Sequence, residues 1–342
     1  MGATQLDSSL PRFLQPSQSP LLTQAPGPVP VHATYGHGRP FGQAQVLWWP
    51  WIPRSQGGSV VPRTVLLFIP GNPGLLDVYI PFLDAIYSEA NSSVAIFAHA
   101  HLGLSSYIGG DRSFPDTSSV TLPAQIQAHV KFLDELLAAY GPETSVLLVG
   151  HSIGAWFIQE MMKARATDLR SCERVGAFML TPTLSEIGGS PNGKTLSPFF
   201  RPPWPRTLAY LSLLVQYTPQ WALRLVLHSW PDDQLRFLHR FLQAPAAIYA
   251  SLVMADDEVK TVLDPDVGFL HEFSGKIWFY YAERDGWVGG QREVILRALR
   301  GTPAEVQVVH GRSDIPHGFC LSNHSADVAS QCLKWMYAGG FL

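Results

Sequence analysis

The stretch Gly150-His151-Ser152-Ile153-Gly154 decides which fold we expect for this chain. It follows an apolar run at residues 145–149 that is typical of a β-strand, and it opens into a helical pattern at 155–163. A G-x-S-x-G motif between a strand and a helix presents its serine on a sharp, strained turn, where the hydroxyl group is accessible. The two glycines leave room for the strand and the helix to approach each other. Ser152 is therefore the candidate nucleophile.

Patterns of strand and helix alternate on both sides of this motif. Short apolar runs predict strands, and apolar residues at spacings of three and four predict helices. The predicted strands cover 45–51, 64–69, 94–98, 145–149, 175–180, 276–281 and 306–309, and the predicted helices cover 76–89, 122–140, 155–163 and 326–336. Such alternation is typical of an open, mostly parallel central sheet with helices on both faces. We therefore expect an α/β fold.

Two parts of the chain lack this alternation. Residues 1–40 are rich in Pro, Ser, Gln and Gly and carry no periodic apolar pattern, which predicts a flexible N-terminal tail. Residues 183–274 contain no strand signal, and we interpret them as a helical cap that lies over the carboxyl edge of the sheet. The α/β core is then expected at 41–182 and 275–342.

A serine hydroxyl is a weak nucleophile unless a histidine takes its proton and an acid orients that histidine. In a sheet of this kind the acid follows one late strand and the histidine follows the next. Asp285 lies just after the strand predicted at 276–281, and His317 lies in the loop after the strand predicted at 306–309. Glu283 is an alternative acid, and His310 and His324 are alternative histidines. The order of strands and loops favours Asp285 and His317.

The oxyanion that forms when a serine attacks a carbonyl group needs two backbone N–H donors. One is expected from Ile153, directly after the serine, and the other from the loop Pro70-Gly71-Asn72-Pro73-Gly74 that follows an early strand. In this loop Gly71 lets the backbone approach closely, Asn72 supplies an N–H group, and Pro73 has none to give. The alternative interpretation is a tight turn that only the topology requires.

Composition excludes other kinds of function. The 342-residue chain has a formal net charge of −3 and no long run of Lys or Arg. Nucleic acid is therefore not an expected partner, because binding its backbone requires a basic surface. Cys172, Cys320 and Cys332 show no C-x-x-C spacing, which argues against a zinc site or a disulfide framework and favours free thiols. Serine chemistry needs no cofactor, and we expect neither a cofactor nor a metal.

Taken together, these residues resemble the α/β-hydrolases and, more narrowly, the lipid-droplet-associated hydrolase family. The resemblance rests on five segments within residues 64–320, which are Phe68–Gly74 (F-I-P-G-N-P-G), Gly150–Gly154 (G-H-S-I-G), Ser190–Gly193 (S-P-N-G), Asp285–Trp287 (D-G-W) and Ile315–His317 (I-P-H). Two positions depart from the family pattern. Gly286 stands where proline is expected and Gly318 where alanine is expected, and both changes can loosen the loops that carry the acid and the histidine.

The resemblance implies an α/β-hydrolase fold in which a Ser-His-Asp triad cleaves carboxylic esters of lipids, of the sterol ester or acylglycerol type. It also implies a cytosol-facing location at lipid droplets and the endoplasmic reticulum. A second hypothesis, from a different class, is a lipid-droplet protein that acts mainly by binding a surface or a partner in lipid storage, with weak or vestigial catalysis. A thioesterase or a lyase is a third, because a fold alone does not fix the reaction.

One segment of the cap region is suited to a lipid surface. Residues 207–221 carry no charge but are interrupted by a proline, whereas a spanning helix needs about 20 apolar residues without a break. A helix or hairpin lying in the interface would hold its aromatic rings near the lipid headgroups, and the candidates are Trp204, Tyr210, Tyr217 and Trp221. Periodicity alone is equally compatible with a buried cap helix, and the resemblance favours the surface.

Overall fold

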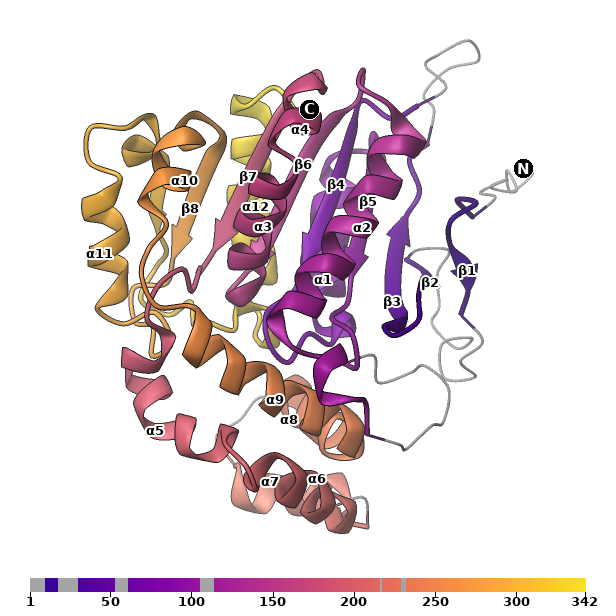
Figure 1. Ribbon diagram of the computed structural model, residues 1–342, viewed down its shortest axis with the longest axis vertical. Helices are drawn as coiled ribbons and strands as arrows, with labels where there is room; N and C mark the ends of the chain where they lie inside the picture. Colours follow the sequence, from indigo (N-terminus) through magenta and orange to yellow (C-terminus); the bar gives the residue numbers. More distant parts are fainter. Residues whose placement is uncertain (1–9, 18–29, 53–60, 105–113, 216, 229–231) are drawn as a thin grey trace.

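The computed structural model describes residues 10–17, 30–52, 61–104, 114–215, 217–228 and 232–342, and over this part of the chain nine strands form one sheet (Figure 1). Their order across the sheet is β1-β2-β3-β5-β4-β6-β7-β8-β9. The strands are β1 (Gln15–Pro16), β2 (Val31–Gly38), β3 (Gly42–Trp49), β4 (Thr64–Ile69), β5 (Val94–His99), β6 (Ser145–His151), β7 (Val175–Leu180), β8 (Ile277–Tyr281) and β9 (Val308–His310).

The sheet is parallel over most of its width. β5, β4, β6, β7, β8 and β9 pair in parallel, while β1, β2 and β3 add an antiparallel edge beside β5. The mostly parallel sheet expected from the sequence is confirmed. The last strand differs from its predicted bounds, because residues Pro303–Gln307 form a 3₁₀ helix with proline in its first turn.

The central strands are buried on both faces, so their side chains alternate between two cores. In β4, Val65, Leu67 and Ile69 belong to one apolar cluster, whereas Leu66 and Phe68 belong to the other. This period of two follows from the pleat of a strand, which points successive side chains to opposite faces. Continuous apolar sequence is therefore what a strand covered on both sides requires.

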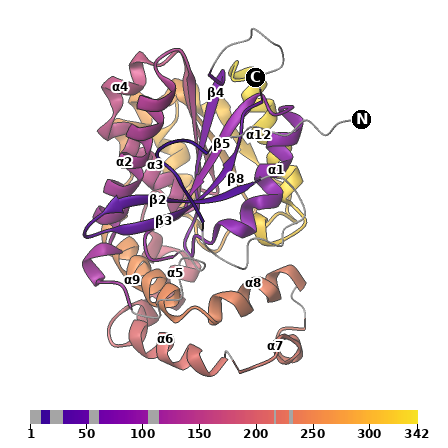
Figure 2. The ribbon, with the colours of Figure 1, turned by 90° about the vertical axis from the view of Figure 1, so that its right-hand side faces the viewer.

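Helices cover both faces of the sheet, as expected (Figures 1 and 2). The first core is closed by α2 (Leu122–Tyr140), α3 (Ile153–Ala164), α10 (Val267–Glu272) and α11 (Gln291–Ala298), and α4 (Ala166–Ser171) follows α3. The second core is closed by α1 (Ile80–Glu89) and α12 (Ser325–Ala338). The helix predicted at 76–89 starts with a 3₁₀ turn over Leu76–Tyr79.

Part of the predicted N-terminal tail belongs to the sheet. Residues 31–38 form β2, which pairs with β3 along its length, and Ala33 and Tyr35 are buried in the first core. The prediction of a flexible tail is therefore wrong for 31–38, and it is also wrong for 10–17, where Leu14 is buried in the first core and Gln15–Pro16 forms β1. The segment at 31–38 carries few apolar residues among glycine and histidine, so it showed no periodic pattern. Residues 1–9 and 18–29 of the predicted tail lie outside the described residues.

The segment between β7 and β8 carries the helices that we call the cap helices. They are α5 (Pro191–Phe200), α6 (Trp204–Val215), α7 (Gln220–Val226), α8 (Asp232–Leu242) and α9 (Pro245–Thr261). The cap predicted at 183–274 is too long at its end, because α10 closes the first core. Figure 1 shows them at the lower end of the molecule, below the sheet. α9 lies nearest the sheet and α6 packs on its outer side, through Ala209 against Ile248 and Tyr249.

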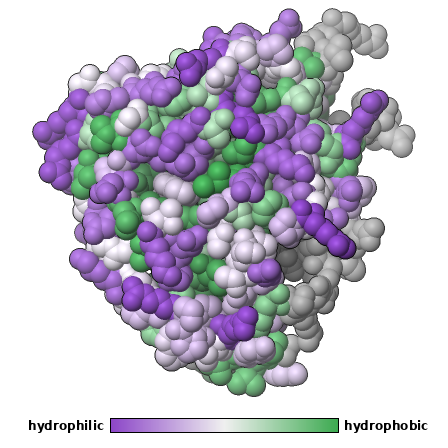
Figure 3. Space-filling model, viewed as in Figure 1, coloured by the Kyte–Doolittle hydropathy of each residue, from purple (hydrophilic) through white to green (hydrophobic). Residues whose placement is uncertain are grey.

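The surface mixes polar and apolar residues, and green apolar residues come to the surface at the lower end, where α6 and α7 lie (Figure 3). Large apolar side chains exposed on these two helices include Tyr210, Leu214, Trp221 and Leu225. Within the described residues, no helix has both the length and the apolar character that crossing a membrane requires.

Candidate active site

Ser152 lies on the sharp turn between β6 and α3, with backbone angles φ 54° and ψ −122°. A positive φ is uncommon for a residue with a side chain and marks a strained turn. The flanking glycines are required by space. A Cβ atom on Gly150 would lie 2.6 Å from the Ala155 nitrogen, and one on Gly154 would collide with the Ile69 carbonyl oxygen. The G-x-S-x-G motif therefore serves to bring β4, β6 and α3 together beneath the half-buried serine.

The three side chains expected to cooperate meet at this turn. Nε2 of His317 lies 3.0 Å from Oγ of Ser152, and Nδ1 of His317 lies 2.7 Å from Oδ2 of Asp285. The second oxygen of Asp285 accepts hydrogen bonds from the backbone N–H groups of Trp287 and Val288, at 2.9 and 3.0 Å. Since Asp285 follows β8 and His317 follows β9, parallel pairing of these strands with β7 carries both loops to the edge that holds Ser152.

The alternative residues lie elsewhere. Glu283 is exposed to solvent, two residues before the acid that contacts His317. His310 ends β9 and stacks on Tyr281, and His324 pairs with Asp327 at 3.2 Å. The structure therefore brings together the acid and the histidine that the order of strands and loops favoured.

Asp285 is held in its ionised form. Burial opposes ionisation, but the hydrogen bond and charge of His317 and the two backbone N–H groups outweigh it, so the pKa of Asp285 lies below its ordinary value. An ionised carboxylate accepts the Nδ1–H bond of His317, which leaves Nε2 free to accept the hydroxyl proton of Ser152. The arrangement is thus suited to a histidine that acts as a base towards serine.

His151 links the loop that carries His317 to the loop after β4. Its Nε2 lies 2.9 Å from the His317 carbonyl oxygen, its Nδ1 lies 2.8 Å from the Tyr79 hydroxyl, and that hydroxyl accepts the Gly71 N–H at 3.1 Å. Burial lowers the pKa of His151 to about 3, so the ring is neutral and donates only from Nε2. His151 is therefore a structural link between two loops, and it does not contact the serine hydroxyl.

Two backbone amides remain for an oxyanion. The Gly71 N–H is used by Tyr79, but the amides of Asn72 and Ile153 have no acceptor among the residues that the structure describes. Ile153 is the first residue of α3, where an N–H group has no partner within the helix. These are the two donors that the sequence predicted, and both line the turn that carries Ser152.

The side chain of Asn72 is bound to the cap helix α9. Its Nδ2 donates to the Ser251 carbonyl oxygen at 3.0 Å and to Oε1 of Glu258 at 2.9 Å, and its Oδ1 accepts from the Ser251 hydroxyl at 2.7 Å. No sequence signal marked Glu258, because it lies in a run of charged residues typical of a solvated helix face. The cap therefore contacts the loop that presents one of the two free amides.

Glu258 is buried beside the serine and is neutral near pH 7. Burial raises the pKa of this carboxyl to about 8, and the charge of Asp257 adds to the effect, although the hydrogen bond from Asn72 opposes it. A neutral carboxyl places no negative charge next to a site where an oxyanion would form. Its ionisation would add one.

We expect the pH dependence of stability to reveal this group. The folded-state pKa of about 8 exceeds the ordinary value of 4.5, so the contribution of Glu258 to stability is full below pH 4.5 and declines up to pH 8. Glu258→Gln should remove this decline, so its melting temperature should exceed the wild-type value by a margin that grows from pH 5 to pH 8. Thermal unfolding across this range measures it, with Glu283→Gln at an exposed position as the control. A constant margin would contradict the assignment.

A cavity of about 500 Å³ opens beside the serine between the core and the cap. The core supplies Ser152, His317 and Trp287 to its lining, while the cap supplies Phe200, Val259 and Glu258. Most of the lining surface is apolar. The cavity therefore suits a molecule with a reacting polar group and an apolar remainder.

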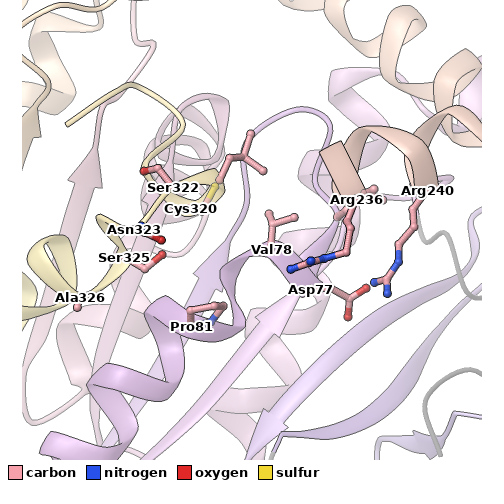
Figure 4. Close-up of a pocket in the computed structure, with 12 residues that line it drawn as sticks. Asp77, Val78, Pro81, Arg236, Arg240, Cys320, Ser322, Asn323, Ser325 and Ala326 are labelled. Carbon is pink, nitrogen blue, oxygen red and sulfur yellow. The ribbon is translucent and has the colours of Figure 1, made fainter. Parts of the chain in front are cut away.

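A second pocket of about 430 Å³ adjoins this cavity, and Val78, Cys320 and Leu321 line both. In Figure 4, Arg236 and Arg240 extend from α8 towards Asp77 on one side of it. The N-terminal end of α12 forms the opposite side. This pocket contains neither Ser152 nor His317. A reacting carbonyl group therefore fits the first cavity and not the second.

The two departures from the family pattern have different surroundings. A Cβ atom on Gly286 would lie 2.8 Å from Oδ1 of Asn192, whose backbone N–H donates to the Gly286 carbonyl oxygen at 2.8 Å. At Gly318 a Cβ atom would meet only Leu321, at an ordinary 3.5 Å, and its φ of −85° suits any residue. Glycine at 286 therefore makes room for the asparagine of the S-P-N-G segment, whereas glycine at 318 meets no such need.

These surroundings predict opposite outcomes for two matched substitutions. Gly318→Ala should leave the melting temperature unchanged or raise it slightly, because alanine restricts the unfolded chain by about 0.4–1 kcal/mol where the backbone allows it. Gly286→Ala should displace Asn192 and lower the free energy of unfolding by about 1–3 kcal/mol, and the melting temperature should fall with it. Calorimetry on both variants provides the comparison. Equal effects would argue against a specific contact between Gly286 and Asn192.

The residues suggested for lipid contact lie apart from this site. Trp204 and Tyr210 are on α6 and Trp221 is on α7, while Tyr217 lies in the turn between them. All four are exposed, with Tyr217 80% accessible. Across the described residues, no three His, Cys, Asp or Glu side chains are grouped as ligands of a metal ion.

Solved structures resemble the chain in fold. A carboxylesterase from Bacillus subtilis is 13% identical, with a TM-score of 0.52, over 90% of this chain and 92% of that one. An epoxide hydrolase from Vigna radiata is 15% identical, with a TM-score of 0.54, over 90% of this chain and 97% of that one. At such low identity the likeness concerns the fold, which is that of the α/β-hydrolases.

Relatives by sequence are more specific. The lipid droplet-associated hydrolase of Homo sapiens is 27% identical over 308 residues, covering 83% of this chain and 89% of that protein. The corresponding protein of Drosophila melanogaster is 25% identical over 256 residues, covering 70% and 78%. The family model described as lipid-droplet associated hydrolase matches residues 62–320, a range that contains Asn72, Ser152, Asp285 and His317. The chain therefore belongs to the family of lipid-droplet associated hydrolases.

Proposed function

We propose that this protein is a serine hydrolase that cleaves carboxylic esters of lipids without a cofactor. Ser152 attacks the ester carbonyl carbon while His317 takes the hydroxyl proton. The amides of Asn72 and Ile153 bind the resulting oxyanion, and His317 then protonates the leaving alcohol. Water, deprotonated by His317, releases the acid from the acyl-enzyme. Asp285 orients His317 and stabilises its charged form throughout.

The observation that carries this proposal is the continuous chain Asp285–His317–Ser152, with contacts of 2.7 and 3.0 Å, beside two backbone amides that have no acceptor among the described residues. Structural proteins have no need of a strained serine, a buried acid and bare amides at one point. The test is labelling by a fluorophosphonate probe together with hydrolysis of acyl esters. Wild type is expected to react in both assays and Ser152→Ala in neither.

Two observations support a lipid as the substrate class. The cavity beside Ser152 is lined largely by apolar side chains, and the curated relatives carry the name lipid droplet-associated hydrolase. A sterol ester or an acylglycerol combines at least one ester group with a large apolar part, and an apolar cavity beside the serine suits that combination. A panel of sterol esters, acylglycerols and short soluble esters, assayed with wild type and Ser152→Ala, tests this class.

The outer face of α6 and α7 supports attachment to a lipid droplet or a membrane of the endoplasmic reticulum, from the cytosolic side. One face of α6 is buried and carries Pro205, Ala209 and Ser212. The opposite face exposes Tyr210, Leu211 and Leu214 to solvent. Apolar patches of this kind on a soluble surface mark interaction sites. Trp204, Tyr217 and Trp221 extend the same face. The cap helices thereby hold the site next to the lipid phase.

This exposed face also favours a second candidate function, in which the protein acts mainly by binding a lipid surface and catalysis is weak. The two functions separate in one experiment. If a Ser152→Ala protein restores lipid storage fully in cells that lack the wild type, binding is the main function. If the Ser152→Ala protein remains on droplets but does not restore lipid storage, hydrolysis is the main function.

A further inference from the structure

Four buried histidines that the proposed reaction does not use form a continuous hydrogen-bonded chain. Nε2 of His37 lies 3.0 Å from Nε2 of His99, and Nδ1 of His99 lies 3.0 Å from Nδ1 of His129. Nε2 of His129 lies 2.9 Å from Nδ1 of His101, and Nε2 of His101 lies 3.0 Å from the Pro70 carbonyl oxygen. The chain ends at the residue before Gly71 and Asn72. His99, His101 and His129 are fully buried, and His37 is 5% exposed.

For uncharged rings, counting donors and acceptors fixes the tautomer of all four. A carbonyl oxygen can only accept, so His101 must donate from Nε2 and accept at Nδ1. His129 then donates from Nε2, His99 from Nδ1 and His37 from Nε2, each towards Pro70. The remaining nitrogen, Nδ1 of His37, must be an acceptor, and it is buried without a partner among the described residues. The chain therefore has one direction along its whole length.

Burial keeps the rings uncharged, which the count assumes. An imidazolium has two N–H groups and no acceptor, so a proton added to His99, His101 or His129 would place two donors face to face unless the rings behind it reversed their tautomers. Burial lowers the pKa of His37 and of His101 to about 4, and it holds the pKa values of His99 and His129 well below their ordinary value. Aromatic rings seal the chain from solvent, with Phe132 centred 4.5 Å from His99 and Phe157 centred 5.1 Å from His101.

The end of the histidine chain is positioned to hold the loop at residues 70–74, which we call the oxyanion loop. The loop wraps closely around His101, because a Cβ atom on Gly74 would lie 2.7 Å from Cδ2 of that ring. The Gly71 N–H is held by Tyr79 and the Asn72 side chain by α9, but neither contact restrains the Pro70 carbonyl group. His101 supplies that restraint, and the three histidines behind it prevent its ring from turning.

We propose that His37, His99, His129 and His101 form an uncharged relay of fixed direction that holds the Pro70 carbonyl group and thereby sets the position of the Asn72 amide. These are positioning residues, and the inference rests on the proposed hydrolase function for its effect on rate. The three nitrogen pairs and the His101–Pro70 contact are bonded in series and do not converge on one point, which distinguishes the relay from a metal site. Nothing in it transfers a proton to the substrate.

Two measurements on the full-length protein test the relay. The first is NMR of protein labelled with ¹⁵N-histidine near pH 7. We expect four neutral rings, with the proton on Nδ1 in His99 and on Nε2 in the other three, and couplings across three N–H···N bonds. A charged ring in this set, or the proton on Nε2 of His99, would overturn the proposal. This measurement does not depend on catalysis, so it stands even if the protein proves not to be a hydrolase.

The second measurement compares turnover in a series of leucine substitutions. Because positioning acts through the Pro70 end, kcat should fall most in His101→Leu, by roughly 10- to 10²-fold with little change in KM, and least in His37→Leu. Losses in melting temperature should instead be similar, since all four rings are buried. His32→Leu, on the same strand as His37 but outside the relay, is the matched control. Losses of kcat that follow melting temperature and not position would reduce the relay to a structural role and refute the inference.

Discussion

Ser152→Ala is expected to lower kcat for ester hydrolysis by about 10⁵- to 10⁶-fold and to abolish labelling by a fluorophosphonate probe. Removal of the nucleophile from a serine–histidine–acid unit has effects of this size. Without the serine hydroxyl, water must attack the ester directly, and the remaining groups accelerate that reaction only slightly. The substitution removes one oxygen atom and keeps the strained backbone at φ 54°, which alanine tolerates no worse than serine. The fold should therefore persist, as circular dichroism and melting temperature will show.

The control for this experiment is Ser171→Ala, an exposed serine on α4 far along the chain from the turn. It should react with the probe like wild type. A Ser152→Ala protein that still labels would show that another nucleophile reacts, and a wild type that never labels despite correct folding would favour the surface-binding function. Asp285→Asn should give a smaller loss, about 10⁴-fold, since asparagine keeps the geometry but selects the wrong tautomer of His317.

The sequence predicted this part of the site because each member depends on local context. Ser152 follows a strand and precedes a helix, and Asp285 and His317 each follow a late strand of a parallel sheet. Parallel strands end at one edge, so the loops after them converge whatever their separation along the chain. The oxyanion loop obeys the same rule. The choice of His317 over His310 and His324 needed only the position of each relative to its strand.

The features that the sequence could not predict depend on which distant segments meet. Glu258 resembles its charged neighbours in α9 until the fold places it against Asn72, 186 positions earlier. The relay histidines come from β2, β5, the loop after β5 and α2, and the contact of His37 with His99 exists only when the antiparallel edge is added to the sheet. β2 was missed for the same reason, since its stability comes from pairing with β3 and not from its own apolar content.

The exposed apolar face of α6 and α7 allows a prediction in which stability and binding separate. Tyr210, Leu214, Trp221 and Leu225 are 59%, 67%, 65% and 73% exposed, so replacing all four by serine should leave the melting temperature unchanged. Full burial of a large apolar side chain contributes about 1.5–3 kcal/mol. If each of the four contributes about 1 kcal/mol on entering a lipid interface, their loss weakens binding by about 4 kcal/mol, on the order of 10³-fold.

Flotation with phosphatidylcholine-coated triolein droplets measures this binding, and hydrolysis of a short soluble ester measures the site independently. The variant with four substitutions should fail to float but should hydrolyse the soluble ester at the wild-type rate, because none of the four side chains contacts Ser152. The matched control replaces Val306 and Tyr337, which are 87% and 63% exposed on other parts of the surface, and it should float normally. Equal flotation of both variants would mean that α6 and α7 do not face the lipid. A simultaneous loss of soluble-ester hydrolysis would instead mean that these side chains support the cap, and through Asn72 the oxyanion loop.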